Sequence, residues 1–143
     1  MNYDVLVIGG GHAGVEAAVM ARRLNLKVAI VTFSSDDIGV MSCNPAMGGL
    51  GKGHLIREID AMGGVMGLAS DLSGIQFRML NRTRGEAVQG PRAQIDRNKY
   101  KSNISNIISS EGIDIIEDEV INILTCLAGN NKTIRGIETE SMG

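Results

Sequence analysis

Apolar and polar positions near the start of the chain predict a strand–helix–strand unit. Short apolar runs rich in β-branched residues occupy 4–9 and 27–32, as expected for strands covered on both faces of a sheet. Between them, residues 13–24 are rich in alanine along one face, which predicts a helix packed closely on that sheet. A unit of this kind implies two parallel strands joined by a right-handed crossover.

A second helix is predicted over residues 95–110, because its apolar residues recur at helical spacing and a glycine follows its end. These residues are Tyr100, Ile104, Ile107, Ile108 and, after the end, Gly112. Residues 113–116 form a third buried-type strand. The intervening sequence is less regular: a loop is predicted over 33–53 and one or two helical turns over 55–62, whereas 63–94 show no clear period.

A β-hairpin is predicted near the end of the chain. Two strand-like runs, 120–127 and 133–139, flank the sequence Gly-Asn-Asn-Lys at 129–132, which has the residues of a tight turn. Cys126 lies inside the first of these runs and is interpreted as structural.

Composition narrows the class of protein. The chain has 143 residues, 43% of them apolar, and a net charge of −2, which fits one globular domain and not a polycation. Two cysteines and two histidines, far apart, exclude a disulfide scaffold and argue against a metal site. No apolar run approaches the roughly 20 residues that span a bilayer, and we expect no secretory or transit peptide, because a strand-like run follows Met1 within two residues. We therefore expect a cytoplasmic protein without membrane association.

A glycine motif lies between the first strand and the alanine-rich helix, where a dinucleotide-binding turn belongs. It consists of Gly9, Gly10, Gly11, His12, Ala13 and Gly14. Gly9 permits a tight turn, Gly11 lets a pyrophosphate approach the backbone, and Gly14 lets helix and strand pack closely. The free N–H groups and the positive end of the helix dipole then face the phosphates.

The residue that would bind the ribose is less clear. The usual acidic residue at the end of the second strand is replaced by Thr32, with Asp36 and Asp37 a few residues later. These residues leave the choice between FAD and NAD open.

Several other motifs are incomplete. The run at 48–53 resembles a P-loop, but Ala46 and Gly53 stand where glycine and serine or threonine belong. Cys43 has no second cysteine close by, which excludes a redox dithiol. His12 is more readily explained as a loop side chain than as a catalytic group.

Four stretches, 7–18, 41–55, 74–81 and 92–97, resemble the start of the glucose-inhibited division protein A family of tRNA-modifying enzymes. The second stretch is specific to this family among flavoproteins. A sister family of folate-dependent tRNA methyltransferases shares the glycine motif but has Glu after the second strand, so Thr32 favours the first family.

The resemblance implies an enzyme that binds FAD and uses NADH as reductant. With a partner GTPase, the family adds a carboxymethylaminomethyl group to C5 of the wobble uridine of tRNAs, and the full-length protein is a homodimer. The resemblance places the FAD pyrophosphate on the glycine motif and the adenine end against the backbone of Val120. It places the loop from Cys43 to Gly53 near the isoalloxazine. Cys43 matches a cysteine proposed to act as nucleophile or proton donor, and a packing role is the alternative.

A basic stretch provides a candidate surface for tRNA. Residues 78–101 contain seven basic and two acidic side chains, which would attract an RNA backbone. A solvated face with internal ion pairs is the alternative interpretation of the same residues.

These observations predict an α/β fold: a Rossmann-like FAD-binding βαβ unit with a parallel sheet plus a β-hairpin. Because a doubly wound domain needs five or six strands, we expect residues 1–143 to be the N-terminal part of an FAD/NAD(P)-binding domain, incomplete and inactive by itself. The alternatives are another FAD- or NAD-dependent oxidoreductase, or an inactive remnant of the tRNA-modifying enzyme.

Overall fold

The predicted βαβ unit is present in the computed structural model, which describes residues 2–128 and 131–141. Strand β1 (Val5–Ile8) leads through helix α1 (His12–Arg23) to strand β2 (Val28–Thr32). Strand β6 (Asp114–Glu117) pairs with β2 on its other side, so the parallel sheet has the order β1-β2-β6. The first three predicted strands are therefore confirmed to within one or two residues.

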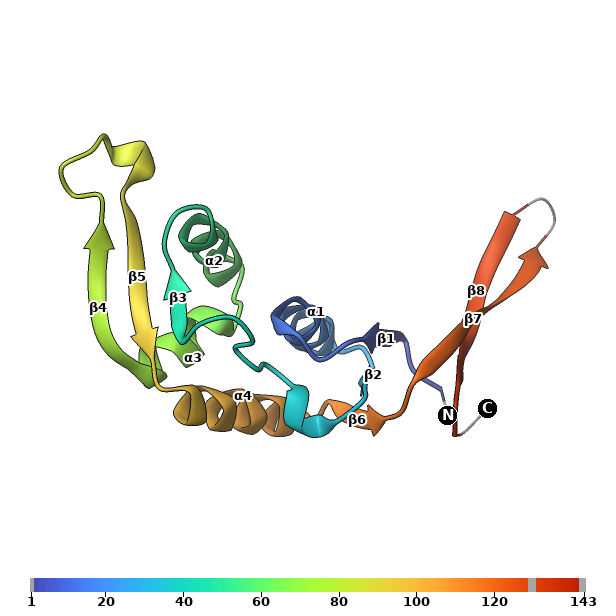
Figure 1. Ribbon diagram of the computed structural model, residues 1–143. Helices are drawn as coiled ribbons and strands as arrows, with labels where there is room; N and C mark the ends of the chain where they lie inside the picture. Colours follow the sequence, from blue (N-terminus) through green and yellow to red (C-terminus); the bar gives the residue numbers. More distant parts are fainter. Residues whose placement is uncertain (1, 129–130, 142–143) are drawn as a thin grey trace.

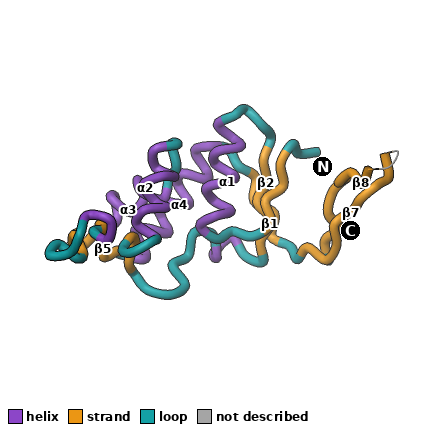
Figure 2. Tube along the Cα trace, turned by 90° about the horizontal axis from the view of Figure 1, so that it is seen from above, coloured by secondary structure: helices purple, strands orange, loops and turns teal. Residues whose placement is uncertain are grey.

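Burial of this sheet differs from the prediction that its strands are covered on both faces. All five residues of β2 are buried, but Ile8 of β1 is 53% exposed and Ile115 of β6 is 42% exposed. The reason is that the core is formed mainly by β2, α1 and α4 (Arg97–Glu111). The hairpin of β7 (Val120–Ala128) and β8 (Asn131–Thr139) lies away from the sheet and does not cover it (Figures 1 and 2).

A second, antiparallel sheet occupies the region that showed no clear sequence pattern. Its order is β3-β5-β4, formed by β3 (Ala46–Gly48), β5 (Gly90–Ile95) and β4 (Gly74–Leu80). Helices α2 (Lys52–Ala61) and α3 (Met66–Ser73) connect β3 to β4 and pack beside this sheet (Figure 1). Two short 3₁₀ helices complete the connections, Ser35–Asp37 and Glu86–Val88.

These elements correct three expectations. The loop expected at 33–53 contains β3, and the helix expected at 55–62 begins three residues earlier, at Lys52. Ile95, expected at the start of a helix, is instead the last residue of β5, because Asp96 caps the helix: its carboxylate accepts from the backbone N–H groups of Asn98 at 3.0 Å and Lys99 at 3.1 Å.

Helix α4 joins the two sheets along the length of the molecule (Figure 1). Tyr100, Ile104 and Ile108 are buried on its inner face, as the spacing predicted, and Gly112 ends the helix in the left-handed conformation with a φ of +66°. The helix packs against both α3 and α1, so its apolar face contributes to the core beside the antiparallel sheet and to the core beside the parallel sheet.

The predicted hairpin is confirmed in its strands, β7 and β8. Two residues of its predicted turn, 129 and 130, lie outside the described residues. The other two, Asn131 and Lys132, are not part of a turn but begin β8, where they pair with Ala128 and Leu127. Cys126, expected to be structural, accepts a hydrogen bond from Arg135 Nε across the hairpin at 3.0 Å. No helix in residues 2–128 and 131–141 is long and apolar enough to cross a membrane.

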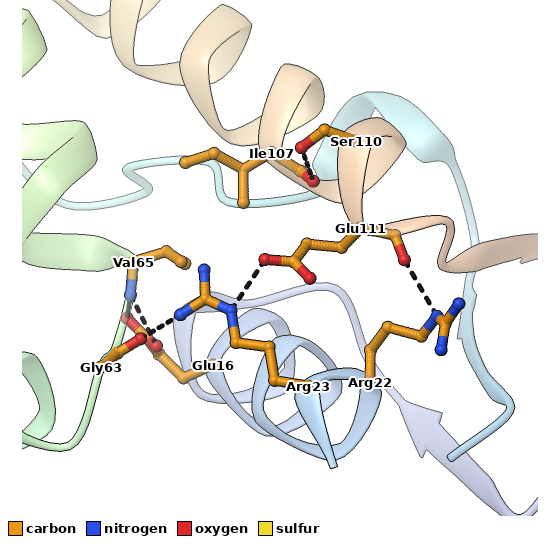
Figure 3. Close-up of polar contacts among 8 residues, drawn as sticks. All are labelled: Glu16, Arg22, Arg23, Gly63, Val65, Ile107, Ser110 and Glu111. Carbon is orange, nitrogen blue, oxygen red and sulfur yellow. Dashed lines mark hydrogen bonds and ion pairs between the residues drawn. The ribbon is translucent and has the colours of Figure 1, made fainter. Parts of the chain in front are cut away.

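Polar contacts tie α1 to the neighbouring helices (Figure 3). Glu16 accepts hydrogen bonds from the backbone of Val65 and Met66 at the start of α3. Arg23 donates through Nε to Glu111 at 2.7 Å and through Nη1 to the carbonyl of Gly63. These contacts fix the orientation of α1, whose first turn carries the glycine motif.

Candidate dinucleotide-binding site

The glycine motif forms a tight turn at the carboxyl edge of the parallel sheet. Gly9 has a φ of +103°, a conformation that side chains rarely adopt, and its N–H donates to Val31 at 2.8 Å. A Cβ on Gly14 would lie 2.1 Å from the carbonyl oxygen of Gly9. Gly9 therefore makes the turn possible, and Gly14 allows α1 to start directly against it.

The N-terminus of α1 is open above this turn. Gly11 is its N-cap residue, and no described side chain caps the first N–H groups from that position. A Cβ on Gly11 would meet no described atom within 4 Å. Free N–H groups at the positive end of a helix dipole suit an anion, so the residues present fit the pyrophosphate of a dinucleotide.

His12 and Ala13 form the first turn of α1, where His12 is half-buried and Ala13 is exposed. The His12 ring packs against Tyr100, with centroids 5.6 Å apart. His12 Nε2 and the Tyr100 hydroxyl are buried and lack a hydrogen-bond partner among the described residues. Burial, and secondarily the charge of Lys52, lowers the pKa of His12, so the imidazole is neutral at pH 7.

The lowered pKa of His12 predicts a pH-dependent stability. A histidine whose folded-state pKa lies below the ordinary value of about 6.5 contributes stability fully above that pH and loses it as the pH falls. Between about pH 7.5 and about pH 5.5, urea unfolding of the wild-type chain should lose at most about 1.4 kcal/mol per pH unit. His12→Gln should show a smaller loss over the same range.

His54→Gln is the matched control for the substitution, because His54 is an exposed histidine of α2. Asp118, which accepts from the Ser141 hydroxyl, has a pKa lowered to about 2, so its effect appears at more acidic pH. An unchanged pH dependence in His12→Gln would contradict the burial argument.

The candidate ribose-binding residues differ in their burial and in their partners. Thr32 ends β2 and is buried at 8% exposure, with its hydroxyl 3.4 Å from the carbonyl oxygen of Ser34. Asp36 is ion-paired with Lys101 of α4 at 2.9 Å, and this hydrogen bond is the main cause of its lowered pKa. Asp37 is exposed. Asp36 is therefore already engaged by a cation.

Sequence reasoning missed Glu117, the register partner of Thr32 on β6. Its carboxylate accepts from the backbone N–H of Ser35 at 2.6 Å, and the hydrogen bonds with Ser35 lower its pKa. An acidic group thus does stand beside the end of β2, but on the neighbouring strand. Only the pairing of β2 with β6 places it there, and no spacing along the chain signals this.

Val120 and the loop before Cys43 are both connected to the same edge of the sheet. The N–H of Asp118, two residues before Val120, donates to Thr32 at 3.0 Å, and the N–H of Gly39 donates to Gly10 at 2.8 Å. Cys43 itself is exposed, with Sγ 3.9 Å from the Ser42 hydroxyl. The glycine turn and the start of β7 therefore lie at the same edge of the sheet. The loop that carries Cys43 is hydrogen-bonded to the glycine turn at Gly39, four residues before the thiol.

The seven basic residues of 78–101 do not act as one cluster. Lys101 binds Asp36, which agrees with the alternative of internal ion pairs for that residue. Arg78 and Arg92 instead lie directly opposite each other on β4 and β5. The stretch is thus divided between α4, the antiparallel sheet and the loop that joins β4 to β5.

Taken together, the parallel βαβ sheet, its glycine turn and the uncapped start of α1 define a Rossmann-like α/β protein of the dinucleotide-binding class. The profile of the family described as Glucose inhibited division protein A matches residues 4–142. The chain belongs to that family, as the sequence resemblance predicted.

Curated relatives and solved structures agree with this assignment. The chain is 48% identical over 141 residues to the tRNA uridine 5-carboxymethylaminomethyl modification enzyme MnmG of Aliarcobacter butzleri, covering 98% of this chain and 22% of that protein. It is 58% identical over 116 residues to the MnmG of Zymomonas mobilis, covering 80% of this chain and 19% of the relative. The chain thus spans about a fifth of the curated relatives it matches.

Aquifex aeolicus GidA matches 96% of the chain with a TM-score of 0.87 and 47% identity, and the match covers 22% of that structure. Thermovibrio ammonificans THI4 matches with a TM-score of 0.63 at 16% identity, over 96% of this chain and 47% of that one. The second likeness shows only that the fold is shared.

Proposed function

We propose that residues 1–143 are the N-terminal part of the FAD-binding domain of an enzyme that modifies tRNA. With a partner GTPase, the enzyme adds a carboxymethylaminomethyl group to C5 of the wobble uridine. Membership of the family and the name of its curated relatives support this activity. The observation that carries the dinucleotide site is the glycine turn, with open space above Gly11 at the uncapped start of α1. Family membership is what favours FAD over NAD as the bound dinucleotide.

In this proposal, the glycine motif holds the pyrophosphate of FAD. The backbone N–H groups at the start of α1 donate to the phosphates, and His12 and Ala13 belong to this first turn. Val120, at the same edge of the sheet, meets the adenine end through its backbone. Bound flavin supplies the redox chemistry. Cys43 acts on the uridine as nucleophile or proton donor, which its exposed thiol permits.

The other partners of the reaction are also assigned by family membership. NADH reduces the flavin, at a site that we place outside residues 1–143. The full-length protein acts as a homodimer in the cytoplasm, where its tRNA substrate resides. The shared identity of 46–58% with MnmG relatives supports these assignments.

The proposal predicts that the purified chain binds FAD saturably and that Gly11→Val weakens this binding by at least about tenfold, about 1.4 kcal/mol. The new side chain would occupy the space above the start of α1, which no described atom fills. The φ of −67° at Gly11 is accessible to valine, so the variant should fold. Quenching of FAD fluorescence on titration measures the affinity.

Gly85→Val is the matched control, because Gly85 also has open space around its Cβ position and a φ of −59° but lies in a distant loop. It should bind FAD as the wild type does. A folded wild-type chain that fails to quench FAD, or a Gly11→Val variant that binds with unchanged affinity, would refute the assignment of the pyrophosphate to this turn.

A further inference from the structure

Two arginines face each other on the open face of the antiparallel sheet. Arg78 of β4 and Arg92 of β5 are register partners, and Gln76 and Gln94 pair at the next level. Ala93, which lies between Arg92 and Gln94 on β5, belongs to the buried core together with Met47, its register partner on β3. The four polar side chains therefore lie on the opposite face, where with Leu80 they line a recess of about 190 Å³.

No described acidic side chain forms an ion pair with either member of this arginine pair. Like charges directly opposite each other on a sheet are destabilising. No described residue forms an ion pair or a side-chain hydrogen bond with Arg78 or Arg92, nor with the amides of Gln76 and Gln94. A guanidinium group binds phosphate oxygens in a bidentate manner. An anion in the recess would therefore satisfy both arginines and remove their repulsion.

We propose that Arg78 and Arg92 bind a backbone phosphate of single-stranded RNA, an inference that rests on the proposed tRNA substrate. The surroundings favour a polyanion over a single small ion, because the exposed Arg82 and Arg84 lie in the loop that joins β4 to β5, directly after the strand that carries Arg78. The glutamine amides beside the pair offer both donors and acceptors to the adjoining nucleotide.

The position of the recess also relates it to Cys43. Strand β3 starts at Ala46, three residues after Cys43, and Ala46 is the register partner of Gln94. Along β5, the order is therefore Arg92, then Gln94, then the end of the sheet from which the Cys43 loop emerges (Figure 1). A strand of RNA anchored on the arginines and running past the glutamines approaches the exposed thiol.

Binding of fluorescein-labelled decauridylate to the whole 143-residue chain tests this site by fluorescence anisotropy. The double variant R78Q/R92Q should weaken binding by about tenfold or more. The slope of log affinity against log salt should become shallower by about 0.7 for each phosphate that the variant no longer neutralises. The double variant R84Q/R97Q removes the same charge from exposed positions outside the recess and should weaken binding clearly less.

Equal reductions in affinity in the two double variants would overturn the site, because general electrostatics would then explain them. The proposal would also fail if the chain did not bind decauridylate, or if inorganic phosphate at equal phosphate concentration displaced the RNA completely. An FAD titration of the same samples separates the two claims. Saturable FAD binding without RNA binding rejects the arginine site alone, whereas absence of FAD binding in the wild type rejects the proposed cofactor.

Discussion

Replacing Gly48 with alanine is expected to lower the free energy of unfolding by about 2–5 kcal/mol. Gly48 has a φ of +94°, and a left-handed backbone costs an L-residue about 1–2 kcal/mol. A Cβ would also lie 2.2 Å from the carbonyl oxygen of Pro91, and overpacking of this kind costs about 1–3 kcal/mol. The clash would push β3 from β5 and weaken the 2.8 Å hydrogen bond from Gly49 to Pro91.

Gly49→Ala separates the two costs. Gly49 has a nearly identical φ of +97°, but its Cβ would meet only Leu80 Cδ1 at an ordinary 3.7 Å. It should therefore show only the backbone cost, about 1–2 kcal/mol. Urea unfolding of both variants measures the difference. Equal destabilisation would show that the clash with Pro91 relaxes without cost.

Replacing Glu16 with alanine should destabilise the fold by about 3–6 kcal/mol, because it removes two hydrogen bonds to a charged group, each of which contributes about 1.5–3 kcal/mol. The carboxylate accepts from Val65 N–H at 3.0 Å (Figure 3). It also accepts from Met66 N–H at 2.6 Å. Both residues are buried, so the two N–H groups would lack a partner where water reaches them poorly. Thermal or urea unfolding gives the destabilisation directly.

Two further variants make the result specific. Glu16→Gln keeps the shape and one acceptor oxygen but removes the charge, so its destabilisation should be intermediate. Glu58→Ala removes an exposed glutamate from α2 and should stay within about 0.5 kcal/mol of the wild type. If Glu16→Ala behaves like Glu58→Ala, the start of α3 does not depend on α1.

The cap that Glu16 provides for α3 could not be predicted from the sequence near that helix. Val65 precedes α3 and has no side chain that can cap it, so the sequence around residue 65 does not signal a helix start. The cap comes from Glu16, 49 residues earlier, on another helix. Likewise, Asp36 was a candidate for the ribose, but Lys101 engages it, and Glu117 stands beside Thr32 instead.

The antiparallel sheet escaped prediction for a related reason. Strand β4 carries exposed residues on both faces along most of its length, so its sequence lacks the alternation of a half-buried strand. Strand β3 is only three residues long, and its Gly48 is needed for the close approach of Pro91. Neither strand has a period that a local pattern can reveal, and their pairing with β5 determines them.

By itself, the sequence determined the βαβ unit, the glycine turn, the helix around Tyr100 and the hairpin strands. Each depends on short-range rules: apolar runs, helical spacing, and glycine where backbone must turn or pack closely. The family followed from motifs for the same reason. Only the tertiary structure decided how the strands pair, which acidic group stands beside Thr32, and that Arg78 and Arg92 face each other. These facts arise from contacts between residues distant in the chain, whose geometry depends on how the whole core packs.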